Sequence, residues 1–164
     1  MDALTLLRDQ ATNADSLFLQ TFATVTPEQA VWRLPGSATN TTGATFLHAY
    51  ASEDEIVHQL LNRATIFVTG GWRDRLGYDP ETVWSFDGRQ DPGLLLAYAR
   101  EVSAATTEYL ASLGPEALDR AIETRRGPRP LAARISVYLV VHKFQHLGEI
   151  AALLGCQGIK GLPF

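Results

Sequence analysis

The stretch that most constrains the fold is residues 131–155, LAARISVYLVVHKFQHLGEIAALLG. Pro130 comes just before it, where a proline is tolerated in the first turn of a helix. Gly155 ends it, where a helix C-terminus favours a residue free to adopt a left-handed conformation. The stretch therefore predicts one long helix. Its two histidines, His142 and His146, are four residues apart, so they lie one turn apart on the same face.

The face that carries the two histidines is otherwise typical of a core-facing stripe. At 100° per residue, five side chains fall within about 60° of it: Ile135, Tyr138, Leu139, Glu149 and Leu153. Burying imidazoles and a carboxylate is costly unless they are paired, hydrogen-bonded or bound to metal. From the spacing alone, two interpretations stay open: a metal site, or an ordinary pair of core or surface histidines.

Three further segments show apolar residues at intervals of three and four, at residues 2–23, 43–62 and 91–114. No segment shows a convincing strand pattern. We therefore predict a single all-α domain over residues 1–164, a four-helix bundle with a long crossover connection between the second and third helices. Because this connection (residues 64–91) contains Trp72, Trp84 and Phe86, we expect an ordered lid.

Composition excludes several classes of protein. The formal net charge is −4, so the chain lacks the basic surface expected of a nucleic-acid-binding protein. A single cysteine, Cys156, rules out an intrachain disulfide and a multi-cysteine zinc site. There is no apolar run long enough to span a membrane and no signal-peptide pattern at the N-terminus. We therefore expect a cytoplasmic protein that binds neither nucleic acid nor membrane.

Two features of the helices bear on assembly. The face of helix 131–155 opposite the histidines is also apolar, and a helix that is apolar all round is buried all round; this face carries Val137, Val140, Phe144, Leu147 and Ala151. We expect a homodimer with this helix at the interface, or else cover from the long connection.

On helix 43–62, His48 projects nearly opposite the apolar stripe. Either that stripe faces a partner and His48 faces the core, or His48 is solvated.

Three motifs together resemble the DinB/YfiT-like superfamily. One is the run His142, His146, Gly148, Glu149 and Ile150 near the end of the last helix, the second is the sequence HAYASED that begins at His48, and the third is GWRDRLG at residues 71–77. Their order and spacing match the superfamily over nearly the whole chain. The resemblance implies a four-helix bundle, often dimeric, with a divalent metal held by three histidines. In this chain those ligands are His48, His142 and His146.

Three neutral imidazoles suit Zn, Ni or Fe better than Mg or Ca, and three protein ligands leave a position open for water or substrate. Some members of the superfamily are transferases or isomerases that use a low-molecular-weight thiol, and others are called hydrolases. We therefore expect a metal-dependent enzyme of one of these kinds that acts on a small molecule. The alternative is a non-catalytic dimeric bundle, an interaction or stress-response protein.

Further residues are candidates for supporting roles. Glu149, three residues past His146, is expected to accept a ring N–H from a ligand or to act as a base. Arg125 and Arg126, with Arg129 nearby, are candidate anchors for an anionic group on a thiol or substrate, although a charge cluster in a loop is more often simply solvated. For Glu53 and Asp54 we expect a solvated or salt-bridged pair, and for His58 a surface or interface position.

Two other metal sites are excluded: Lys143 stands where a zincin needs glutamate, and the third helix lacks the histidine of a di-iron bundle.

Overall fold

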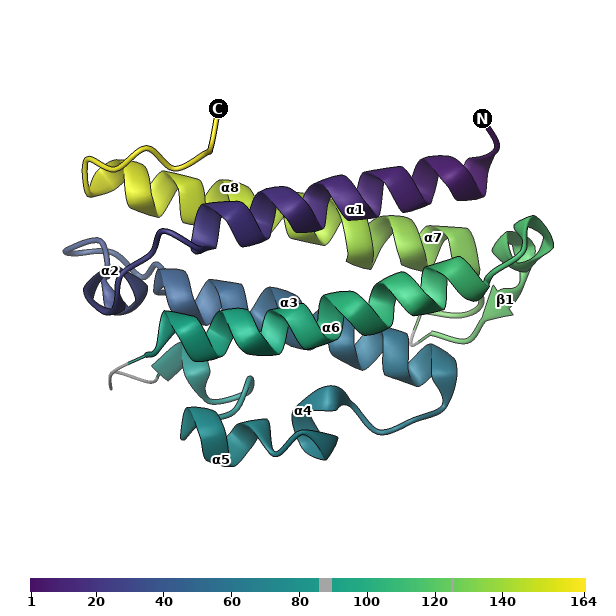
Figure 1. The fold of residues 1–164 in the computed structure, drawn as a ribbon, viewed down its shortest axis with the longest axis horizontal. Coiled ribbons are helices and arrows are strands. Elements are labelled where there is room, and N and C mark those ends of the chain that lie inside the picture. The colour runs from purple at the N-terminus through teal and green to yellow at the C-terminus, as the bar shows by residue number, and fades with distance from the viewer. Residues whose placement is uncertain (86–89, 125) are drawn as a thin grey trace.

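The computed structural model describes residues 1–85, 90–124 and 126–164. Four long helical segments form the bundle: α1 (Ala3–Phe22), α3 (Thr42–Leu61), α6 (Pro92–Ser112) and a last segment made of α7 (Leu131–Ile135), η3 (Ser136–Val141) and α8 (His142–Cys156). Figure 1 shows α1 running alongside the last segment in the same direction, with α3 and α6 both running the opposite way in the other layer. The predicted all-α four-helix bundle is confirmed.

The shorter elements lie at the ends and sides of the bundle. They are α2 (Pro27–Val31), α4 (Ile66–Thr69), α5 (Trp72–Leu76), and the 3₁₀ turns η1 (Val83–Ser85) and η2 (Pro115–Asp119). Two strands of two residues each, β1 (Ala121–Ile122) and β2 (Arg129–Pro130), pair in an antiparallel manner. Since α3 and α6 are parallel, the chain between them must return along the length of the bundle (Figure 1). This return is the long crossover that the sequence predicts, and it carries α4, α5 and η1.

Side chains that accept backbone N–H groups mark the helix starts. Asp2, Thr41 and Asp91 cap α1, α3 and α6, and Thr26 forms a capping box with Gln29 at the start of α2. Such caps satisfy N–H groups that have no partner inside the helix, and each is worth about 1 kcal/mol. Local sequence therefore sets the helix boundaries within one or two residues of those predicted.

The apolar stripe of α3 packs inside the monomer. Phe46 stacks on Phe22 with ring centroids 3.7 Å apart, and it also contacts Phe18 and Tyr50. All four rings are fully buried. The expectation that this stripe faces a partner subunit is therefore wrong: α1, α6 and α8 cover α3 from several sides, so both its apolar stripe and His48 turn toward other helices.

The crossover is anchored through buried polar contacts. Asp54 of α3 accepts hydrogen bonds from the backbone N–H groups of Ile66 and Phe67 and from the Tyr98 hydroxyl. Trp72 is fully buried and donates its indole N–H to Glu101 at 3.0 Å. The described part of the crossover is thus ordered, as expected, whereas Phe86 lies outside the described residues.

The last helical segment differs from the predicted continuous α-helix by one π turn, η3, directly before His142. Its outer face is only partly covered, because Val140 and Leu147 are buried while Val137, Val141 and Phe144 are exposed. The homodimer stays a prediction.

None of the helices in the described part of the chain is long and apolar enough to cross a membrane.

Candidate metal centre

Three histidines from two antiparallel helices converge on one point. His48 comes from the first half of α3, and His142 and His146 come from the start of α8. One ring nitrogen from each lies within 4.8 Å of the others. All three side chains are partly buried. The structure therefore brings together the three residues that the family resemblance assigned to a metal.

The two histidines of α8 face each other through Nε2. These atoms are 3.0 Å apart. On the other side of its ring, His146 Nδ1 lies 2.8 Å from Oε2 of Glu149. A carboxylate at that distance accepts a hydrogen bond from Nδ1–H, and in that tautomer Nε2 carries a lone pair directed toward His142.

Burial favours the neutral form of two of the three histidines. It lowers the pKa of His142 to about 4, with smaller contributions from His146 and His48. Burial also lowers the pKa of His48, and the charge of a protonated His146 lowers it further. A histidine must be neutral to bind a metal ion, so the environment holds two of the three rings in the ligating form at neutral pH.

The donor set fits a divalent transition metal. Two nitrogens bound at 2.0–2.1 Å to a tetrahedral ion lie about 3.4 Å apart, which is close to the Nε2 separation of His142 and His146. Two lone pairs that face each other at this distance repel unless a proton or a cation lies between them. Imidazole suits Zn, Ni and Fe, whereas Mg and Ca prefer oxygen.

Aromatic side chains wall the cluster. The indole of Trp84, in η1 of the crossover, lies 4.8 Å from the His48 ring between centroids. The Tyr138 ring, in the π turn, lies 6.2 Å from that of His142. The crossover therefore contributes directly to the site, as the lid expectation implied. A π turn is unusual in soluble helices and frequently marks a functional site.

A groove of about 1000 Å³ lies between α3 and the last helical segment; it shares Tyr138 with the surroundings of the cluster, and none of the three histidines lines it. On α3 it is lined by Ser52, Glu55 and Gln59, which continue the face of His48. Its far side carries three arginines and one glutamate: Arg126, Arg129, Arg134 and Glu123. The Arg134 guanidinium stacks over Tyr138 at 4.5 Å and donates to the Gln59 amide oxygen.

A family model described as the DinB superfamily matches residues 10–150. The chain belongs to the DinB superfamily. A solved structure, of a conserved protein from Enterococcus faecalis, is 18% identical, covers 94% of this chain and 99% of its own, and superposes with a TM-score of 0.75. That likeness concerns the fold alone. No curated protein matches the chain.

In this DinB superfamily member, the predicted supporting residues have different outcomes. Glu149 contacts a ring nitrogen of His146, the first of the two roles expected for it. Arg126 lines the groove, whereas Arg125 lies outside the described residues. Arg134 was missed, because eight residues at 100° each put it about 80° from His142 and so outside the predicted histidine face.

Other polar residues lie away from the cluster. His58 is buried and bonded to Asp54, so the expected surface position is wrong. Glu53 and Asp54 are both buried and paired, in agreement with a salt-bridged pair but not with a solvated one. Cys156 is exposed at the end of α8.

Proposed function

We propose that this DinB superfamily protein is a metal-dependent enzyme that transfers a group to or from a low-molecular-weight thiol. The observation that carries the proposal is the convergence of ring nitrogens from His48, His142 and His146. Three such ligands leave at least one position open. A metal ion held there would activate a bound thiol or water by favouring its deprotonated form.

The residues around the cluster support this function in different ways. Glu149 accepts a hydrogen bond from Nδ1–H of His146 and so keeps Nε2 available as a ligand. Trp84 and Tyr138 limit access of bulk water to the rings. The two aromatic rings therefore shape and desolvate the site.

The groove favours a thiol over water as the second reactant. Its volume of about 1000 Å³ is at the upper end of small-molecule pockets and gives room for a thiol beside a substrate. Arg126, Arg129 and Arg134 together exceed the two glutamates that also line it, Glu55 and Glu123. A thiol that carries carboxylates would place its sulfur near the histidines and its anionic groups among the arginines. A metal-dependent hydrolase is the second candidate.

Metal content tests the first step of the proposal. The purified untagged protein is expected to contain close to one equivalent of Zn, Ni or Fe by elemental mass spectrometry, and His146→Ala is expected to lose it. Gln145→Ala is the matched control, because Gln145 is the exposed neighbour on the same helix. Equal metal in all three proteins would overturn the ligand assignment.

Activity tests the second step. The metal-loaded protein is expected to accelerate reaction of a carboxylated thiol with a model alkyl halide. In that reaction the sulfur forms a bond to carbon, halide leaves with the bonding electrons, and the thiol proton passes to solvent. Hydrolysis of an ester substrate without any thiol requirement would instead support the hydrolase. No acceleration of either reaction by the metal-loaded protein would favour a non-catalytic bundle.

A further inference from the structure

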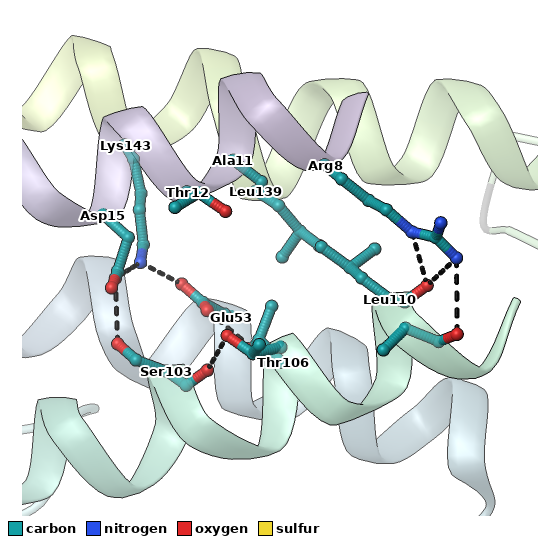
Figure 2. Close-up of a pocket in the computed structure, with 12 residues that line it drawn as sticks. Arg8, Ala11, Thr12, Asp15, Glu53, Ser103, Thr106, Leu110, Leu139 and Lys143 are labelled. Carbon is teal, nitrogen blue, oxygen red and sulfur yellow. Dashed lines mark hydrogen bonds and ion pairs between the residues drawn. The ribbon is translucent and has the colours of Figure 1, made fainter. Parts of the chain in front are cut away.

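A second cavity lies apart from the three histidines, between α1 and α6 (Figure 2). Its volume is about 310 Å³. Its floor is formed by Glu53 of α3, Leu139 of η3 and Lys143 of α8, and none of the three clustered histidines lines it. Lys143 and His142 are neighbours in sequence, but their side chains leave the helix in directions about 100° apart. The cavity is therefore a separate site.

One end of the cavity holds three ionic side chains in contact. The Lys143 ammonium bonds to Asp15 Oδ1 and lies 2.7 Å from Glu53 Oε2. Glu53 and Lys143 are 1% and 2% exposed. Two carboxylates thus face one ammonium group. Buried charges need compensation, so this end of the cavity favours a further cation.

Hydroxyl groups donate hydrogen bonds to both carboxyl groups at this end. Tyr50 and Ser103 both donate to Asp15 Oδ1, and Thr106 donates to Glu53 Oε1 at 2.6 Å. Hydrogen bonds of this kind favour the ionised form of a carboxyl group, and at Glu53 they offset part of the burial that raises its pKa. Asp15 Oδ2 accepts no hydrogen bond from any residue that the structure describes. This oxygen is the acceptor left for a ligand.

The opposite end of the cavity is positive. Arg8 donates through Nε and Nη2 to the carbonyl oxygens of Leu110 and Leu113 at the C-terminal end of α6. Within the described ranges, Arg8 has no carboxylate partner, and its Nη1 donates no hydrogen bond. A guanidinium group with two free N–H donors is suited to a carboxylate.

The wall between the two ends is largely apolar. It contains Ala11, Leu110 and Leu139 (Figure 2). Arg8 and Asp15 are seven residues apart on α1, which corresponds to about 10 Å along the helix. We propose that this cavity binds an aliphatic ω-amino acid, with its ammonium group at Asp15, its carboxylate at Arg8 and its methylene chain along Ala11 and Leu139.

The charge separation distinguishes this ligand from related ones. An α-amino acid has its two charges on adjacent groups and cannot reach both ends. A diamine would place a positive charge beside Arg8, and a dicarboxylate would place a negative charge beside Glu53. Only a zwitterion with separated charges matches both ends, and the small volume limits it to a short chain.

Calorimetry tests the proposal with defined probes. ω-Aminohexanoate and ω-aminooctanoate are titrated into the full chain, with hexylamine and hexanoate as singly charged controls. We expect at least one ω-amino acid to bind about tenfold more tightly than either control, which is the effect of one charge-assisted hydrogen bond. Equal binding of hexylamine, or no binding of the ω-amino acids at millimolar concentration, would overturn the assignment.

Variants locate the binding. Ala111 is exposed and lines the cavity, whereas Ala104 is exposed on the same helix but does not line it. Ala111→Phe is expected to abolish binding, and Ala104→Phe to leave it unchanged. Asp15→Asn is expected to weaken it about tenfold or more. Unchanged binding in Ala111→Phe would overturn the proposed location. Metal content is measured on the same samples, so failure of this site is distinguishable from failure of the metal centre.

Discussion

Oε2 of Glu149 lies 2.8 Å from Nδ1 of His146, on the side of the ring away from the histidine cluster. One imidazole therefore contacts a carboxylate through one nitrogen and faces His142 through the other. Such a carboxylate raises the basicity of the ligand and fixes its orientation. An exposed acidic side chain thus influences how His146 binds a metal ion.

Removing this carboxylate is expected to weaken metal binding. Glu149→Ala should lower the affinity for Zn²⁺ by roughly 10- to 100-fold, because His146 loses the group that orients it. Competition with a chromophoric chelator measures the affinity, and Gln145→Ala on the same helix is the control. If Glu149→Ala bound Zn²⁺ with an affinity within about twofold of the parent, Glu149 would not support the ligand.

The metal-free protein is expected to lose stability as the pH falls. His142 has an ordinary pKa of 6.5 in the unfolded chain and about 4 in the folded protein. Between these values the unfolded state binds a proton that the folded state does not, so the free energy of unfolding decreases as the pH falls from 6.5 to about 4. Above 6.5 this residue contributes no pH dependence.

Urea unfolding of the metal-free protein at several pH values measures this slope. His142→Gln removes the titrating group and is expected to reduce the slope between pH 6.5 and about 4. An identical slope in the parent and in His142→Gln would show that other groups cause the pH dependence.

Breaking the buried ionic cluster is expected to be costly. Lys143→Met leaves Asp15 and Glu53 without their shared cation, and removal of one partner of a buried ion pair costs about 3–5 kcal/mol of unfolding free energy. The double variant Lys143→Met with Glu53→Gln is expected to recover part of this loss, because one uncompensated carboxylate is removed as well. Urea unfolding measures both variants. A cost no larger than that of a solvent-exposed ion pair, about 1 kcal/mol, would contradict the cluster's role.

Arg134 is expected to select carboxylated thiols. Under the proposed function, Arg134→Gln should raise the KM for N-acetylcysteine by about 10-fold or more, since it removes a charge-assisted hydrogen bond. The KM for cysteamine, which lacks a carboxylate, should change little. Steady-state kinetics with both thiols separate the two effects, and Arg63→Gln, at an exposed position outside the groove, is the control. An equal rise in KM for both thiols would indicate a general structural effect.

Local sequence was enough to predict most of the architecture. Apolar residues at intervals of three and four locate the long helices, and the predicted ends lie within two residues of the observed ones, because helical periodicity depends on residues close together in the chain. The π turn before His142 was not predicted. It depends on how the surrounding helices pack and leaves no clear mark in the pattern of residues.

The sequence predicted the candidate site only in part. Spacing alone placed His142 and His146 on one helix face, whereas the inclusion of His48 rested on the family resemblance. A helical wheel for α3 set His48 opposite the apolar stripe, and it gave no means of deciding what covers that side. The structure answers this, because α8 packs there and supplies the other two rings.

The sequence by itself determined which side chains share a helix face, and with that the helical bundle, the histidine pair of α8 and the position of Glu149 beside it. Only the tertiary structure decided which faces meet. It joined His48 to the other two histidines, and it buried Lys143 between Asp15 and Glu53, three residues from three different helices. The physical reason is that helical periodicity is local, whereas contacts between helices depend on packing among segments far apart in the chain.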